Sequence, residues 1–214
     1  MHKQDILNIM TSPGIIAIIR SDHQHGLVRA AHALYDAGIT TVEISLTTPG
    51  TLDAIRLIQE QLPDGCVIGV GTVVTPETVS ESVAQGAQFA VSPVFSESVI
   101  EACTQAGIPI VCGAYTPTEA WHAFTGGADF IKIFPANQLG PDYIKALLAP
   151  MPQLPLVPTG GVTLQNCASY LRAGSVAVAI GTSVVNTQLI KDENWEGITH
   201  RAQEYVKAVK RAGS

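Results

Sequence analysis

Eight short runs of apolar, strand-forming residues recur along the chain, and a helix-like stretch follows each of them. No other feature limits the possible folds so strongly, because about eight β/α units in 214 residues match a closed (β/α)₈ barrel. The expected strands are Ile15–Arg20, Thr41–Leu46, Val67–Val73, Phe89–Ser92, Pro109–Gly113, Phe130–Phe134, Pro155–Thr159 and Val176–Gly181. The alternative is an open doubly wound sheet. The barrel is favoured because the units are regular and no glycine-rich dinucleotide motif follows the first strand.

The helical stretches carry their own signals. In 24–37, Leu27, Ala30, Ala31 and Leu34 form an i, i+3, i+4, i+7 stripe. Residues 1–11 predict an extra amphipathic N-terminal helix rather than a signal peptide. No linker or change in composition divides the chain, so a single barrel domain is expected over 1–214.

Composition narrows the classes of function. The chain is 46% hydrophobic and 14% charged, its net charge is −6, and it has no dense basic run, so neither nucleic acid nor a membrane surface is an expected partner. The longest apolar runs are too short to span a bilayer. Four scattered cysteines and six histidines without ligand spacing predict no metal site, and the cysteines fit buried, reduced thiols in the cytoplasm.

Two charged residues interrupt apolar strands. Lys132 lies within Phe130–Pro135, and Glu43 lies within Thr41–Leu46, on the strand face expected to point into the barrel. A buried amine is shifted towards its neutral, nucleophilic form, and a buried carboxyl towards a pKa suited to proton transfer. The simpler interpretation is that the two form a structural salt bridge. We favour a catalytic lysine with a glutamate as general acid/base.

Further candidates follow from the rule that functional groups of such barrels lie at the carboxyl ends of the strands. Thr159-Gly160-Gly161 and Gly181-Thr182-Ser183 follow the seventh and eighth strands, where backbone N–H groups commonly bind phosphate. Ordinary tight turns would also explain these glycines. Arg20 ends the first strand and could bind a carboxylate or phosphate or form a rim salt bridge, while Thr72 and Ser92 offer hydroxyls at neighbouring strand ends.

Taken together and in order, several motifs resemble those of the 2-keto-3-deoxy-6-phosphogluconate (KDPG) and 4-hydroxy-2-oxoglutarate (KHG) aldolases, a family of class I Schiff-base aldolases. The motifs are Val42–Leu46, Gly69–Val73, Val91–Pro93, Ile131–Pro135, Gly140-Pro141 with Tyr143–Leu147, and Val157–Val162.

This resemblance implies a homotrimer of (β/α)₈ barrels that needs no metal or cofactor. It implies that Lys132 forms the Schiff base and Glu43 shuttles protons. The substrate would be bound by Thr72, Phe134 and Pro93 at the pyruvate end and by Thr159, Gly160, Gly161, Gly181 and Thr182 at the phosphate end.

One position departs from the family pattern. Thr47 stands where many members carry an arginine that helps to bind the pyruvate carboxylate, and we expect Arg20 to supply the missing cation. Thr159 resembles the gluconate-type enzymes, so the expected reaction is cleavage of KDPG to pyruvate and glyceraldehyde 3-phosphate in the Entner–Doudoroff pathway. KHG or another 2-keto-3-deoxy sugar acid remains an alternative substrate.

Two other classes of function also fit these residues. A phosphosugar isomerase or epimerase would use Glu43 as a base without a covalent lysine. A non-catalytic protein that binds sugar-acid phosphates would use Lys132 only as a counter-ion.

Overall fold

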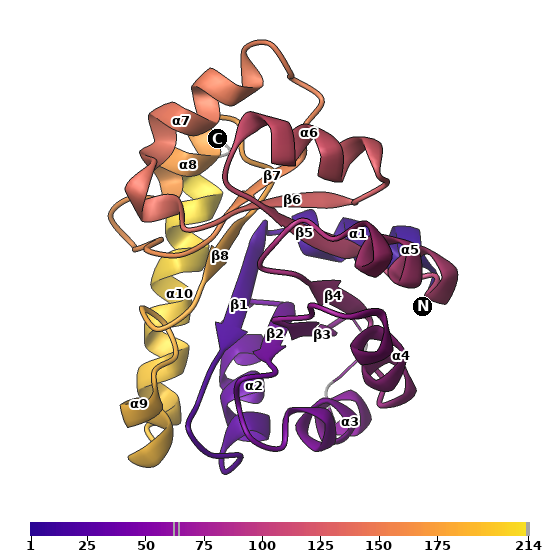
Figure 1. Cartoon of the computed structure of the whole chain (residues 1–214). Coiled ribbons are helices and arrows are strands. Elements are labelled where there is room, and N and C mark those ends of the chain that lie inside the picture. The colour runs from indigo at the N-terminus through magenta and orange to yellow at the C-terminus, as the bar shows by residue number, and fades with distance from the viewer. Residues whose placement is uncertain (62, 64, 213–214) are drawn as a thin grey trace.

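The computed structural model describes residues 1–61, 63 and 65–212, and its centre is an eight-stranded parallel sheet rolled into a barrel (Figure 1). The strands are β1 (Ile15–Ile19), β2 (Thr41–Ser45), β3 (Val67–Gly71), β4 (Phe89–Val91), β5 (Ile110–Ala114), β6 (Phe130–Ile133), β7 (Leu156–Pro158) and β8 (Val178–Ile180). All eight predicted strands are confirmed, and each observed end lies within two residues of the expected one.

Strand order explains how the barrel closes. The strands pair in sequence order from β1 to β7, and β8 pairs with β1, with Ile15 opposite Val178 and Ala17 opposite Ile180. A bridge between Thr159 and Ala179 joins the β7 and β8 sides. The (β/α)₈ barrel predicted from the sequence is therefore confirmed.

Helices surround the barrel and follow the strands in turn. They are α2 (Leu27–Asp36), α3 (Thr51–Gln61), α4 (Pro76–Ala84), α5 (Glu97–Ala106), α6 (Pro117–Thr125), the 3₁₀ helix η1 (Ala136–Gln138), α7 (Gly140–Leu148), α8 (Cys167–Arg172), α9 (Thr187–Lys191) and α10 (Trp195–Ala212). The predicted stripe on α2 is confirmed, since its four residues are all buried. The long helix α10 runs along the outside of the barrel against α2 and α8 (Figure 1).

The core has two layers. The larger layer lies between the sheet and the helices and contains the outward-facing strand residues such as Val42, Ile44 and Ile131. The smaller layer fills the barrel interior with side chains such as Phe89 and Phe130. Inward and outward positions alternate along each strand, so residues two positions apart share a face.

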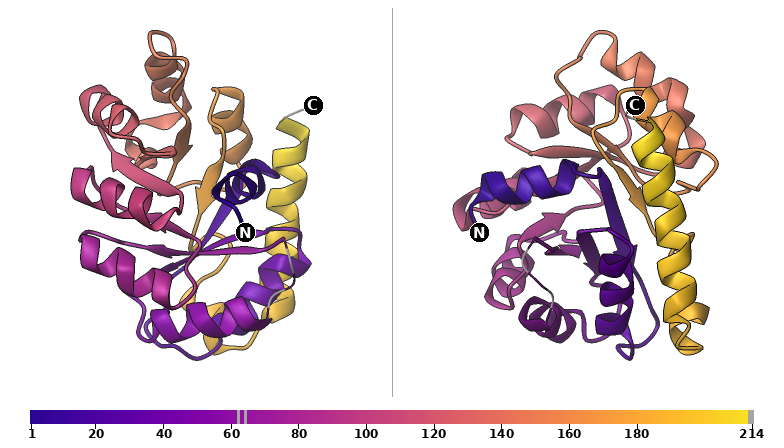
Figure 2. Two further views of the ribbon diagram at one scale, coloured as in Figure 1. Left: turned by 90° about the vertical axis from the view of Figure 1, so that its right-hand side faces the viewer. Right: turned by 180° about the vertical axis from the view of Figure 1, so that it is seen from behind.

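The expected extra N-terminal helix is also present. Helix α1 (Lys3–Thr11) lies at the end of the barrel where β1 begins, and it buries Ile6 and Met10 against the interior layer (Figure 2). Lys3 and Asp129 form an ion pair of 2.9 Å that ties this helix to the start of β6. The helix closes this end of the barrel, which leaves the opposite end available for a site.

The four cysteines are buried with free thiols, and burial raises the pKa of Cys66 and Cys103 to about 12, which makes these thiols unreactive. Of the helices in the described part of the chain, none has the length and apolarity needed to cross a lipid bilayer.

Candidate active site

A cavity of about 520 Å³ opens at the carboxyl ends of the strands, opposite α1. Every predicted site residue except Thr47 lines it, namely Arg20, Glu43, Thr72, Pro93, Lys132, Phe134, Thr159, Gly160, Gly161, Gly181 and Thr182. These residues are up to 162 positions apart in the sequence, from Arg20 to Thr182, and they meet because the carboxyl ends of the strands lie at one end of the barrel.

Lys132 projects from β6 into this cavity. The side chain is only 6% exposed, and its Nζ lies 5.1 Å from the centroid of the Phe134 ring. Burial lowers the pKa of Lys132; the nearby positive charge of Arg20 acts in the same direction, and the carboxylate of Glu43 opposes both. The environment therefore shifts Lys132 towards the neutral amine, which is the nucleophilic form.

Glu43 faces Lys132 from the other side of the barrel, since β2 and β6 are four strands apart in the order of the sheet. Burial raises the pKa of its carboxyl group, and the charges of Lys132 and Arg20 only partly oppose this. Among the described residues neither Glu43 nor Lys132 takes part in a direct ion pair. The salt bridge of the simpler interpretation is therefore not formed, and both groups are available to a ligand between them.

Gly71 makes room for the glutamate. A Cβ atom built at Gly71 would collide with Oε1, Cδ and Cγ of Glu43, so the carboxylate lies directly over the β3 backbone. The absence of a side chain at Gly71 thus leaves the space that the Glu43 carboxylate occupies.

Hydroxyl groups gather beside Glu43. Ser45 lies two residues further along β2 and is fully buried; its Oγ is 2.9 Å from Thr72 Oγ1 and 2.8 Å from Thr47 Oγ1. Thr47 is exposed and does not line the cavity, although the sequence placed it among the substrate-binding residues. Ser92, another sequence candidate, is buried and donates to the carbonyl oxygen of Val94 instead.

The glycine-rich loops form the opposite wall. Gly160 and Gly161 have φ angles of +87° and +73°, a conformation that glycine adopts without strain and that lets the backbone approach a ligand closely. The amide of Asn166 accepts from the Thr163 backbone N–H and donates to the Gly161 carbonyl, at 2.8 and 3.0 Å. Ser183 donates to the Val162 carbonyl at 3.1 Å, which joins the loops after β7 and β8.

Sequence reasoning missed several lining residues, namely Ile18, Val162, Thr163 and Ala179. Ile18 lies two positions after Ile16, which belongs to the barrel interior, so strand alternation could have found it. Val162 and Thr163 follow the glycine pair, and only the path of the loop shows that they reach the cavity.

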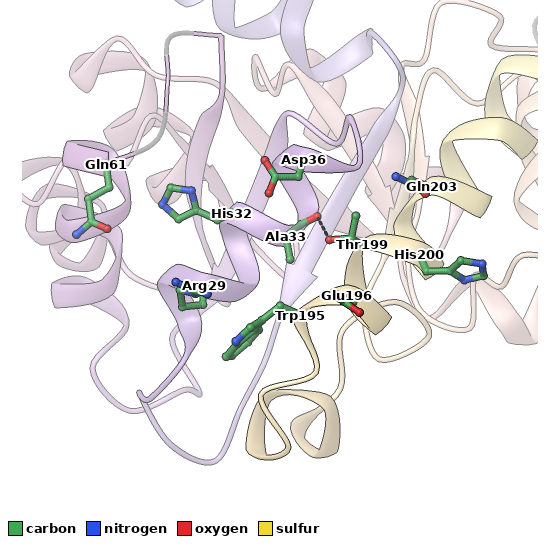
Figure 3. A pocket seen from close by; sticks show the side chains of 10 residues that line it. All are labelled: Arg29, His32, Ala33, Asp36, Gln61, Trp195, Glu196, Thr199, His200 and Gln203. Carbon is green, nitrogen blue, oxygen red and sulfur yellow. Dashed lines mark hydrogen bonds between the residues drawn. The ribbon is translucent and has the colours of Figure 1, made fainter.

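A second hollow, of about 580 Å³, lies outside the barrel between α2 and α10 (Figure 3). It is an open groove with charges of both signs, among them Arg29, Asp36 and Glu196. Thr199 donates to the Ala33 carbonyl at 3.0 Å and holds the two helices together at its floor (Figure 3). None of the strand-end residues reaches this groove, so the predicted chemistry lies in the barrel cavity.

Comparisons with known proteins identify the family of the chain. The family model described as KDPG and KHG aldolase matches residues 6–201. The chain is 33% identical over 199 residues to the 2-dehydro-3-deoxy-phosphogluconate aldolase of Dickeya dadantii, covering 92% of this chain and 93% of that protein. It is 34% identical over 199 residues to the 2-dehydro-3-deoxy-6-phosphogalactonate aldolase of Escherichia coli, covering 92% and 95%.

Solved structures give the same result. The KDPG aldolase of Legionella pneumophila, with pyruvate captured as a covalent carbinolamine intermediate, superposes with a TM-score of 0.83 at 31% identity, covering 92% of this chain and 96% of that one. With a family model that spans most of the sequence and relatives that match almost end to end, the chain belongs to the KDPG and KHG aldolase family.

Proposed function

We propose that this chain, a class I aldolase and therefore a lyase, cleaves KDPG to pyruvate and glyceraldehyde 3-phosphate through a Schiff base on Lys132. The observation that carries the proposal is a buried lysine with a lowered pKa facing a buried glutamate with a raised pKa in one cavity. A lysine whose pKa is lowered by burial serves as a nucleophile, a role that an isomerase or a binding protein does not require.

The first half of the reaction forms the Schiff base. The neutral Nζ of Lys132 attacks the C2 ketone to give a carbinolamine. Glu43, in its protonated form, donates a proton to the departing hydroxyl group, and water leaves to give an iminium ion. The raised pKa of Glu43 suits this role because a general acid works best when its pKa lies near the working pH.

The second half breaks the C3–C4 bond. The ionised Glu43 takes the proton of the C4 hydroxyl, the bond electrons move into the iminium, and glyceraldehyde 3-phosphate leaves as the aldehyde. The remaining enamine is protonated at C3, which the same carboxyl group can do. Addition of water at C2 then releases pyruvate and restores the Lys132 amine.

The two ends of the cavity suit the two ends of the substrate. At the pyruvate end, the Arg20 guanidinium and the Thr72 hydroxyl are offered to the C1 carboxylate, and Pro93 and Phe134 shape the space around it. At the far end, the backbone of Gly160, Gly161, Gly181 and Thr182 is offered to the phosphate.

Thr159 supports the choice of the gluconate configuration. The residue is only 4% exposed, lines the cavity, and donates its hydroxyl to the Val157 carbonyl at 3.3 Å, a long bond that a substrate hydroxyl could replace. Overall identity does not separate the two sugar acids, since gluconate-type and galactonate-type relatives are 33% and 34% identical to this chain.

The family resemblance and the composition support proposals for the location, oligomeric state and pathway of the enzyme. We propose a cytoplasmic homotrimer of one-domain chains that acts in the Entner–Doudoroff pathway. The buried free thiols support a location in the reducing cytoplasm. The exposed side chains of Val94, Tyr115 and Trp121 on neighbouring loops and helices support self-association.

The test is a comparison of kcat/KM for KDPG, its galactonate epimer and KHG, with pyruvate release followed by its reduction with NADH. We expect KDPG to be preferred by at least about tenfold, equivalent to 1.4 kcal/mol, and Thr159→Val to reduce that preference. A wild-type preference for the epimer or for KHG would refute the substrate assignment. Failure to cleave all three would refute the proposed function.

A further inference from the structure

Three hydroxyl groups form a continuous chain from the protein surface to the cavity. Thr47 is exposed, Ser45 is fully buried and Thr72 lines the cavity, and their oxygens are separated by 2.8 and 2.9 Å. Both distances are typical of O–H···O hydrogen bonds.

Two directions of donation are open to this chain, because either oxygen of each hydroxyl pair can be the donor. The backbone N–H of Thr47 donates to Ser45 Oγ at 3.4 Å, which occupies one of the two lone pairs of that oxygen. If the Thr47 hydroxyl donates to the other lone pair, the Ser45 hydroxyl is left to donate its proton to Thr72 Oγ1. The hydroxyl of Thr72 then has its proton free for the cavity, and the exposed oxygen of Thr47 can accept from water.

A carboxylate in the cavity would select this same direction. An ionised carboxylate only accepts hydrogen bonds, so it requires Thr72 to be a donor. In a chain of hydroxyls each bond polarises the next, and the last donor becomes stronger. The opposite direction would point the proton of Thr72 at Ser45 and turn a lone pair towards the carboxylate.

The side chain of Thr72 reaches the cavity through a backbone conformation that is unusual for threonine. Its φ angle is +68°, in the left-handed region that is unfavourable for a β-branched residue. On β3, Val70 faces the helices and Gly71 faces the barrel, so strict alternation would turn Thr72 outwards. The left-handed backbone conformation instead places its side chain in the cavity beside Ser45.

We propose that Thr47 and Ser45 are positioning residues, which orient the Thr72 hydroxyl as a donor to the carboxylate of the keto acid. This inference rests on the proposed function. It gives Thr47 a role through Ser45 and Thr72 rather than by contact with the substrate.

The experiment measures the pyruvate concentration that gives half-maximal covalent adduct when the protein is treated with borohydride. Thr47→Val removes the hydroxyl with little change in shape, and Thr47→Ser restores it. Because Thr47 is exposed, neither change leaves a cavity in the core. Both variants are also made in a Thr72→Val background, so that coupling between the two positions can be measured.

We expect Thr47→Val to raise the half-maximal pyruvate concentration about fivefold, the effect of one ordinary hydrogen bond, without lowering the maximal amount of adduct. Thr47→Ser should return it to near the wild-type value, and Thr47→Val should have no further effect once Thr72 is valine. An unchanged concentration in Thr47→Val, or the same increase in both backgrounds, would overturn the inference. Absence of any adduct in the wild-type protein would instead overturn the proposed function, and this inference with it.

Discussion

Replacement of Gly71 by alanine should impair the catalytic function of Glu43, although Glu43 itself is not mutated. Gly71 is not one of the glycines with a positive φ angle, so alanine can adopt the backbone conformation at this position. The added methyl group, however, would occupy the space of the Glu43 carboxylate. Since the methyl group is fixed to the strand, the glutamate side chain must move away.

The size of the effect follows from this displacement. Real Cβ atoms do not approach other heavy atoms within 3.0 Å, and the carboxylate lies well inside that limit, so it must shift by about 1 Å or more. A misplacement of that size costs about 10²-fold in rate, and general acid–base catalysis as a whole contributes about 10²–10⁴-fold. We therefore expect kcat to fall by about 10²-fold in Gly71→Ala.

The assay is steady-state release of pyruvate from KDPG, with thermal unfolding to show that the variant is folded. Glu43→Ala provides the matched background, because it removes the side chain with which the new methyl group would collide. In that background Gly71→Ala should lower kcat by no more than about twofold. A folded Gly71→Ala protein with wild-type kcat, or an equal loss in both backgrounds, would refute the role given to the position of Glu43.

Three further predictions follow from burial. Because burial lowers the pKa of Lys132, the rate of adduct formation with pyruvate should rise with pH and level off below 10.5, the ordinary value; a rise that continues to 10.5 would contradict this. The pKa of Lys132 is higher in the unfolded chain than in the folded protein, so protonation of Lys132 favours the unfolded state. This loss of stability is absent above pH 10.5 and grows as the pH falls below that value. Lys132→Met should therefore abolish activity and raise Tm at neutral pH by roughly 2–4 °C, whereas Lys145→Met on the exposed face of α7 should not raise it. Met10→Ala should destabilise the fold by about 2–5 kcal/mol in chemical denaturation and leave kcat within about twofold, because α1 closes the end of the barrel opposite Lys132; a comparable loss of kcat would show that the two ends are coupled.

Much of this architecture could be predicted from the sequence, for identifiable reasons. Each strand carries apolar residues on both faces, because a barrel strand is covered by helices outside and by packed side chains inside. Lys132 and Glu43 are charged residues within such apolar strands, so the sequence alone identifies them as candidates for a functional role. The rule that strand ends meet at one end of the barrel then gathered Arg20, Lys132 and the two glycine-rich loops into one cavity.

The remaining features depend on the backbone beyond the strands, which no periodicity describes. Thr72 enters the cavity because of its left-handed conformation, which a threonine rarely adopts. Thr47 turns outwards after the end of β2, although a direct contact with the substrate was expected from its position in the motif. Val162 and Thr163 reach the cavity through a loop that two consecutive glycines bend and Asn166 holds.

The most direct test of the account is intact-mass spectrometry after incubation with pyruvate and borohydride, followed by peptide mapping. The wild-type protein and a Lys145→Ala control should each gain the mass of one reduced pyruvate adduct, located on Lys132, and folded Lys132→Ala should gain none. No adduct on the folded wild-type protein, or an adduct that persists in Lys132→Ala, would contradict the assignment of Lys132 as the Schiff-base lysine.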